Sequence, residues 1–145
     1  MLTKIQGLSK AGNRIPLVEG LYRARVVRLG PAGHAPNPCL SATFFILGPE
    51  PYTGRFVRTR LYCHDRAVWK LRWFLKDFNY DSDLLAADEL DDSRVVGLEG
   101  VIRLAYWGRE GHRRLDVQGF APSERWEELN ISAVPLAGVS EAARV

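Results

Sequence analysis

Few residues in this sequence could build a disulfide-stapled, metal-bound or membrane-spanning protein. The 145 residues include two cysteines and three histidines. Cys39 and Cys63 stand far apart without CxxC spacing, which favours two reduced thiols over a disulfide or a zinc site. No apolar run approaches the roughly 18 residues that a membrane-spanning helix needs. The N-terminal stretch lacks the apolar segment of a signal peptide, so we expect a cytoplasmic protein that does not enter a membrane.

Motifs of catalysis and of cofactor binding are also missing. The stretch GPAGHAP at residues 30–36 lacks the GxxxxGK[ST] pattern of a phosphate-binding loop. No nucleophile elbow occurs, and no Ser/His/Asp grouping has a recognisable context. The acidic residues between positions 81 and 92 do not have the spacing of a calcium loop, which favours a solvated segment. We therefore expect no catalytic residues, no metal and no cofactor, and a protein that is not an enzyme.

What the sequence does have is an uneven distribution of charge. The formal net charge is only +3, but residues 55–76 carry seven cations against the single anion Asp65. Residues 77–99 reverse the sign, with eight anions against Arg94. Such a pair of blocks is compatible with a surface that binds a polyanion. It is equally compatible with two surfaces whose charges pair with each other.

Hydrophobic periodicity predicts a mostly β chain with one main α-helix. A helical repeat begins after Asp65, which we expect to be the N-cap, and ends near Phe78. We expect the acidic residues 81–93 to form a loop that contains a short turn at residues 84–89, and residues near 124–129 to form a short second helix. Alternation typical of strands predicts five of them, at residues 20–29, 39–47, 54–62, 100–107 and 112–120.

One face of each predicted strand is apolar and is expected to point into the core. On the helix, we expect Trp69 and Trp73 to pack in the core with Leu71 and Phe74. The run of Gly, Pro and Asn at residues 30–38 is expected to end the first strand and to form an exposed loop. The strand residues expected to point inward are Tyr22, Ala24, Val26, Leu40, Ala42, Phe44, Ile46, Val57, Thr59, Leu61, Ile102, Leu104, Tyr106, Leu115 and Val117.

The order of three strands, a helix and two strands favours one fold class. It is the order of an OB-fold, a five-stranded Greek-key barrel with its helix between strands three and four. Another small barrel or an α+β sandwich is the alternative. We expect residues 1–16 to form a flexible N-terminal arm, residues 17–123 the OB-fold domain and residues 124–145 a C-terminal extension.

The third predicted strand carries an unusual outward face. Phe56, Arg58, Arg60 and Tyr62 share the side opposite Val57, Thr59 and Leu61. Arginine neutralises phosphates and releases counterions, and an exposed ring stacks on a base. Alternating the two residue types along one strand would therefore follow a single strand of nucleic acid.

Structural explanations compete with this interpretation. The two rings could be covered by the N-terminal arm, by the C-terminal tail or by a second subunit. The two arginines could pair with the acidic segment, and a one-residue bulge would turn all four side chains inward. On the binding interpretation, the candidate nucleic-acid-binding residues are Arg23, Arg25, Phe45, Phe56, Arg58, Arg60, Tyr62, Arg103, Trp107 and Arg114.

Six short stretches, taken in order, resemble a known family. They are VEGLYRARVV, LSATFFIL, PYTGRFVRTRLYC, DRAVWKLRWFLKDF, VVGLEGVIRLAYW and RRLDVQGFAPS, between Val18 and Ser123. Together they resemble the small OB-fold single-stranded DNA-binding proteins of bacteriophages, prophages and mobile elements. The resemblance implies an accessory of DNA replication or recombination. Its binding-face residues would be Phe45, Phe56, Arg58, Arg60 and Tyr62.

Two functions of different classes follow from these patterns. The first is sequence-tolerant binding of single-stranded DNA, by arginine–phosphate contacts and base stacking; the pattern does not distinguish DNA from RNA. The second is an OB-fold protein-interaction subunit of a mobile-element or defence complex, whose aromatic face would be a protein interface. Either function is compatible with a homo-oligomer.

Overall fold

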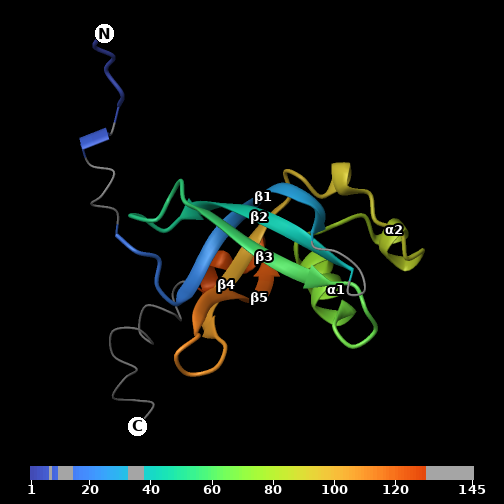
Figure 1. The fold of residues 1–145 in the computed structure, drawn as a ribbon. Coiled ribbons are helices and arrows are strands. Elements are labelled where there is room, and N and C mark those ends of the chain that lie inside the picture. The colour runs from blue at the N-terminus through green and yellow to red at the C-terminus, as the bar shows by residue number, and fades with distance from the viewer. Residues whose placement is uncertain (7, 10–14, 33–37, 130–145) are drawn as a thin grey trace.

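The computed structural model describes residues 1–6, 8–9, 15–32 and 38–129 (Figure 1). Its centre is one five-stranded antiparallel sheet in the order β3-β2-β1-β4-β5. The predicted mostly β class is therefore confirmed. The strands are β1 (Gly20–Ala32), β2 (Cys39–Gly48), β3 (Phe56–Tyr62), β4 (Glu99–Trp107) and β5 (Arg114–Pro122).

Short helical segments accompany the sheet. The main helix, α1, follows β3 and precedes β4 in the chain, as predicted. One helical turn, η3, follows β5, and the helical residues 126–129 continue it. Within the described ranges, no helix is both long and apolar enough to cross a bilayer. The helical segments are α1 (Val68–Asp77), α2 (Ser82–Ala86), η2 (Asp92–Arg94) and η3 (Ser123–Arg125).

The core lies between one face of the sheet and the apolar side of α1. Phe44 of β2 contacts Phe74 and Phe78 at ring-centroid distances of 5.5 and 5.6 Å. Phe120 of β5 lies 5.3 Å from Phe74, so aromatic rings connect the middle and one edge of the sheet through the helix. Of the fifteen strand residues predicted to point inward, fourteen are buried or partly buried, and Val26, Ile46 and Leu61 are fully buried.

The two edge strands of the sheet are joined by side chains. The buried hydroxyl of Thr59, on β3, donates a hydrogen bond of 2.8 Å to the carboxylate of Asp116, on β5. Because β3 and β5 lie at opposite ends of the strand order, this bond requires the sheet to coil back on itself. In Figure 1, β3 passes in front of β5.

The first strand is longer than predicted. Pro31 and Ala32 pair with Leu40 and Cys39, so β1 continues three residues into the stretch expected to be a loop. The physical reason is that β1 pairs with β4 only as far as Arg25. Beyond that point one side of β1 is an edge, where proline needs no ladder hydrogen bond. Residues 33–37 of the predicted loop lie outside the described residues, as do residues 130–145 of the predicted extension.

The prediction that Asp65 caps the main helix is wrong. The helix begins at Val68, its N-cap is Ala67, and no side chain caps it. A backbone turn takes that place, because the amides of Ala67 and Val68 both donate to the carbonyl of His64 at 2.9 Å. The predicted end is confirmed, since Phe78 is the C-cap.

Two predictions at the β4–β5 hairpin are also wrong. Tyr106 has the parity of the inward residues Ile102 and Leu104, but it is 47% exposed. The hairpin extends past the end of the core, and the Arg113 guanidinium lies 5.6 Å from the Tyr106 ring centroid instead. The last strand begins at Arg114 rather than at residue 112, because residues 108–113 form the turn.

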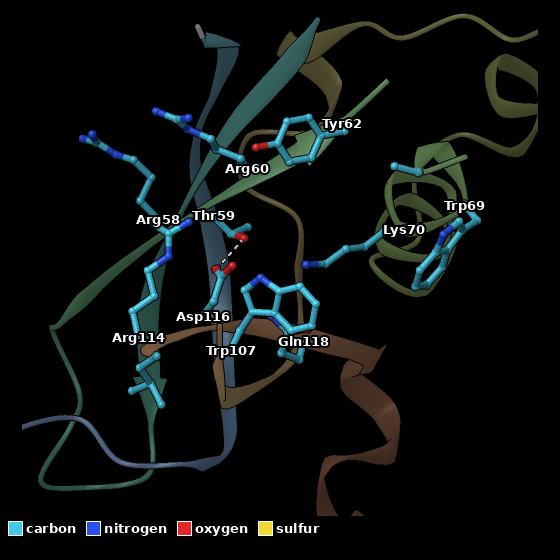
Figure 2. A pocket seen from close by; sticks show the side chains of 12 residues that line it. Arg58, Thr59, Arg60, Tyr62, Trp69, Lys70, Trp107, Arg114, Asp116 and Gln118 are labelled. Carbon is cyan, nitrogen blue, oxygen red and sulfur yellow. Dashed lines mark hydrogen bonds between the residues drawn. The ribbon is translucent and has the colours of Figure 1, made fainter. Parts of the chain in front are cut away.

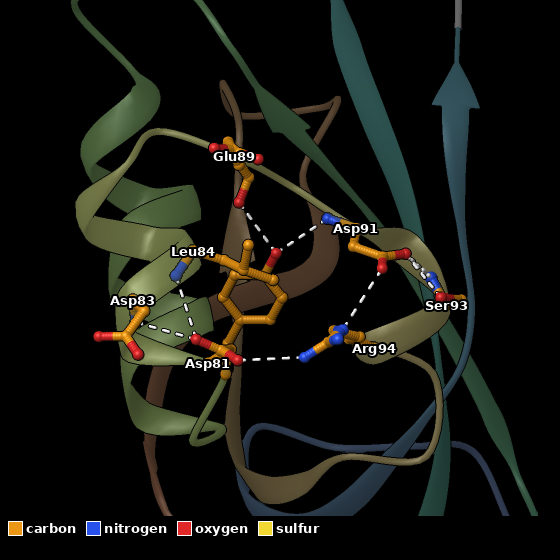
Figure 3. A network of polar contacts seen from close by, with 8 residues as sticks. Asp81, Asp83, Leu84, Glu89, Asp91, Ser93 and Arg94 are labelled. Atoms are coloured by element: carbon orange, nitrogen blue, oxygen red, sulfur yellow. Dashed lines mark hydrogen bonds and ion pairs between the residues drawn. The ribbon is translucent and has the colours of Figure 1, made fainter.

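The acidic segment is an ordered set of caps rather than a plain loop. The Asp81 carboxylate accepts hydrogen bonds from the first amides of α2, and Asp91 caps η2 through the Ser93 amide. Figure 3 shows both carboxylates turned toward Arg94, at 3.1 and 3.5 Å. The buried Tyr80 hydroxyl donates to the carbonyl of Glu89. Asp81 and Asp91 are therefore paired with Arg94, within their own segment.

We expect Gly100→Ala to destabilise the fold. A Cβ atom at Gly100 would lie 2.6 Å from two carbons of the fully buried Phe78 ring. Overpacking of this kind costs about 1–3 kcal/mol of unfolding free energy, measured by urea denaturation. Gly30→Ala is the control, because nothing lies within 4 Å of its Cβ position. Equal stability of the two variants would contradict the packing of Phe78 against β4.

Asp91→Asn should lower stability at neutral pH and have little effect in acid. Hydrogen bonds from Ser93 and the charge of Arg94 hold the pKa of Asp91 below its ordinary value. Its contribution is therefore present above the unfolded-state pKa and is lost as the pH falls through the lower folded-state pKa. Thermal unfolding at about pH 7 and about pH 2.5 checks this. Asp88→Asn in the same segment is the control, and an equal loss for Asp91→Asn at both pH values would contradict the prediction.

Candidate nucleic-acid interface

The register predicted for the third strand is confirmed. On β3, Thr59 and Leu61 are buried and Val57 is partly buried, whereas the four alternate side chains are exposed. Phe56 is 62% exposed and Tyr62 is 38% exposed. The two rings and the two arginines of β3 therefore point away from the core. No bulge interrupts the pairing of β3 with β2.

A cleft of about 690 Å³ lies between the two edge strands. The Thr59–Asp116 hydrogen bond crosses it, and the first turn of α1 forms one end (Figure 2). β3, the β4–β5 hairpin and α1 all contribute side chains, so the cleft depends on the tertiary fold. Its lining residues are Arg58, Thr59, Arg60, Tyr62, Ala67, Trp69, Lys70, Trp107, Arg114, Leu115, Asp116 and Gln118.

The charge of the cleft is strongly positive. Four cations line it, and Asp116 is the one carboxylate among the lining residues. Asp116 already accepts hydrogen bonds from the Thr59 hydroxyl and the Val117 amide, each at 2.8 Å. Within the described part of the chain, ion pairs involve only Arg25, Arg94 and Arg125 among the cations. The arginines of the cleft therefore have no ion-pair partner among the described residues and can contact a negatively charged ligand.

Lys70 is the most enclosed cation of the cleft. Its ammonium group donates a hydrogen bond of 2.7 Å to the carbonyl of Val117, which ties α1 to β5. Burial lowers the pKa of Lys70, and the nearby Asp116 carboxylate opposes that shift. Figure 2 shows this side chain reaching from α1 toward the strands. Lys70 therefore positions the helix against the sheet as well as adding charge to the cleft.

Exposed aromatic rings stand around the same cleft. Trp107 at the end of β4 is 61% exposed, and Trp69 at the start of α1 is 59% exposed. The expectation that Trp69 packs in the core is therefore wrong. It stacks on the partly buried Trp73 at 6.2 Å, and Trp73 packs edge-on against Phe120. Trp69 is thus an outer ring supported from below by the core.

Five of the ten residues predicted to bind nucleic acid line this cleft. They are Arg58, Arg60, Tyr62, Trp107 and Arg114. Phe45 and Phe56 lie on the same outer face at the other end of β3, as an edge-to-face pair 5.4 Å apart.

The structure does not bring the remaining three predicted residues into the cleft. Arg25 forms an ion pair with Glu99 across β1 and β4, at 2.9 Å. Arg103 donates to the carbonyl of Gln118 at 3.3 Å. Arg23 is exposed on β1, outside the cleft lining. These arginines were candidates only because inward and outward side chains alternate along a β-strand. That alternation shows which way a side chain points, but it does not show which strands come together in space.

Among the cations and exposed rings that line the cleft, sequence reasoning left out two, Trp69 and Lys70. Both lie in the helical stretch WKLRWF, whose rings resemble ordinary core residues. The signal available in the sequence was the spacing of four between Trp69 and Trp73 at the start of the helix, where an outer ring can stack on an inner one. Nothing in the sequence shows that this turn lies beside β3 and β5.

Binding is the chemistry that this arrangement supports. Across the described residues, no three His, Cys, Asp or Glu side chains gather in a way that could hold a metal ion. Cys39 and Cys63 are free thiols, and burial raises the pKa of the Cys63 thiol. A positive, ring-lined, open cleft with free guanidinium groups is suited to a ligand that carries both negative charge and flat surfaces.

Thr59→Val should loosen the cleft and destabilise the protein. The substitution keeps the shape of the buried side chain but removes the donor to Asp116. Leaving a part-buried carboxylate short of a partner costs about 1–3 kcal/mol. Thr53→Val is the control, since its hydroxyl makes an exposed bond to the Leu47 carbonyl. Urea denaturation measures the loss of unfolding free energy in both variants. Equal losses would show that the Thr59–Asp116 bond stabilises the protein no more than an exposed hydrogen bond does.

Comparison with known proteins does not identify a function for this site, so we interpret it from the chemistry of its residues. The resemblance to phage-type single-stranded DNA-binding proteins rests on short stretches, and the order of the stretches carries the likeness. No family model matches the chain, and no curated protein matches it.

Proposed function

We propose that this protein binds single-stranded DNA with little sequence preference, as an accessory of replication or recombination. The observation that carries the proposal is the cleft between β3 and β5, where four cations and three exposed rings surround one carboxylate that is already hydrogen-bonded. Arginine contacts with phosphates release counterions and supply affinity that does not depend on sequence. Stacking on Tyr62, Trp69 and Trp107 adds about 1–3 kcal/mol per base.

The rings favour a single strand over a duplex. A base inside a duplex is already stacked and paired, so its face cannot reach a ring on the protein surface. The rings of Trp69 and Trp107 stand on opposite elements, the helix and the hairpin. A flexible single strand can bring an unpaired base to either ring, whereas the bases of a duplex stay stacked and paired with each other.

We further propose that the five-stranded sheet is an OB-fold. The helix lies between β3 and β4 in the chain, and the strand order places β3 and β5 at the edges. A partly open five-stranded barrel brings its edge strands together in this way. The Thr59–Asp116 hydrogen bond between those edges supports this assignment.

An oligonucleotide titration tests the proposed function. Tryptophan fluorescence should be quenched by oligo-dT, and the affinity should fall steeply as salt rises, because phosphate contacts release counterions. A duplex of the same length should bind much more weakly. No quenching by oligo-dT, or an affinity independent of salt, would overturn the proposal. A parallel titration with oligo-rU compares RNA with DNA.

Paired substitutions on β3 separate the two kinds of contact. Arg58→Ala/Arg60→Ala should weaken binding and reduce its salt dependence, whereas Phe56→Ala/Tyr62→Ala should weaken it with the salt dependence retained. Arg72→Ala/Lys76→Ala is the matched control, because it removes two exposed cations of α1 that do not line the cleft. Unchanged thermal stability shows that the losses concern binding. A loss equal to the control's in both β3 variants would contradict the assigned face.

The edge-to-face pair of Phe45 and Phe56 favours a second candidate function, a protein-interaction subunit. This pair lies outside the positive cleft, and Phe56 is largely exposed. Exposed aromatic residues of this kind are typical of protein interfaces. Size-exclusion chromatography with light scattering, with and without oligonucleotide, distinguishes the two functions. A stable oligomer of the free protein that Phe56→Ala disrupts would support the interaction function.

A further inference from the structure

A second hollow, of about 280 Å³, lies on the other side of β3 from the helix. Three arginines line it, Arg28 from β1 and Arg58 and Arg60 from β3. The hydroxyl side chains of Ser41 and Thr43, on β2, lie between them. Among the described residues, neither an aromatic ring nor a carboxylate lines the hollow. Its chemistry is therefore that of an anion site, distinct from the ring-lined cleft.

The register of the strands explains why these arginines gather. Arg28 pairs with Thr43, and Thr43 pairs with Arg58, so the three residues form one row across β1, β2 and β3. The next row contains Gly30, Ser41 and Arg60. Residues in such a row point to the same face of the sheet. A β-bulge between Val26 and Arg28 shifts the register of β1, and thereby aligns Arg28 with this row.

Arg58 and Arg60 line both hollows, so β3 divides them. In Figure 2 their guanidinium ends extend away from α1, while Trp69 and Lys70 stand on the α1 side of the cleft. None of the three arginines takes part in an ion pair within the described part of the chain. Like charges so close together favour an anion with more than one negative group.

We propose that the hollow of Arg28, Arg58 and Arg60 binds consecutive phosphates of the strand, and that the bases enter the cleft of Trp69 and Trp107 on the other side of β3. This inference rests on the proposed function and assigns the phosphates and the bases to different sides of β3. Arg28 is a phosphate-binding residue of this site, and the DNA strand crosses over β3. The hydroxyl groups of Ser41 and Thr43 provide neutral donors to the same phosphate oxygens.

An oligonucleotide without bases tests this division. Binding of oligo-dT and of an abasic oligonucleotide of equal length is measured against salt for each variant. Arg28→Ala should weaken both ligands by the same factor and should reduce the salt slope by about 0.7 per lost phosphate contact. Trp107→Leu should weaken oligo-dT by about 5- to 150-fold and leave the abasic ligand unchanged.

Two controls make the test specific to the hollow. Arg25→Ala removes a cation from the same strand and the same face, but that cation is paired with Glu99 outside the hollow, so the salt slope should not change. Arg28→Lys keeps the charge and should restore the slope. Arg28 is exposed, so thermal stability should be the same in both Arg28 variants.

The outcomes separate this inference from the function beneath it. If the wild type binds oligo-dT but Arg28→Ala changes binding no more than Arg25→Ala, the phosphate hollow is refuted and the proposed function stands. If Arg28→Ala weakens oligo-dT but not the abasic ligand, the division between the two sides of β3 is refuted. If the wild type binds neither oligonucleotide, both proposals fail together.

Discussion

The meeting of β3 with β5 is the constraint on which the candidate site depends. The two strands are the edges of the sheet, and a part-buried hydrogen bond between Thr59 and Asp116 joins their side chains. Without this approach, the arginines of β3 and the tryptophan of β4 would stand on separate parts of an open sheet. The same bond holds the one carboxylate among the lining residues, and the four cations that line the cleft outnumber it. The interaction therefore shapes the cleft, and the surplus of cations makes it positive.

The separation of opposite charges reinforces that effect. Arg94 draws Asp81 and Asp91 together at the far side of α1, where they also cap two short helical segments. Carboxylates used in this way do not reach the arginines of β3. The small net charge of the chain therefore conceals an acidic part, in which two carboxylates pair with Arg94, and a basic cleft whose cations form no ion pair among the described residues.

Local patterns predicted the strands well because alternation is a local property. The outward face of β3 follows directly from the spacing of Val57, Thr59 and Leu61, and the structure places these residues inward. The extension of β1 through Pro31 was not predictable in the same way, because it depends on where β4 stops pairing. Tyr106 has the right parity for the core, but parity does not show where the core ends.

The site was harder to predict than the fold for a related reason. Alternation identified exposed arginines on several strands, but it could not show that Arg25 meets Glu99 while Arg58 remains free. Trp69 looked like a core ring because its helix is amphipathic, and only the packing of Trp73 beneath it leaves it outside. The bulge that aligns Arg28 with β3 appears in the sequence only as a change of parity, because the inward residues pass from Ala24 and Val26 to Leu29.

The position of Trp107 has a mechanical consequence. The β4–β5 hairpin continues beyond the fully buried Leu104 and Val117, so the Trp107 indole lies near the tip of the hairpin. A small tilt of the hairpin would change the distance between Trp107 and Trp69 without exposing any buried ring. For the proposed binding of single strands, such a tilt would let the opening accept bases of different size.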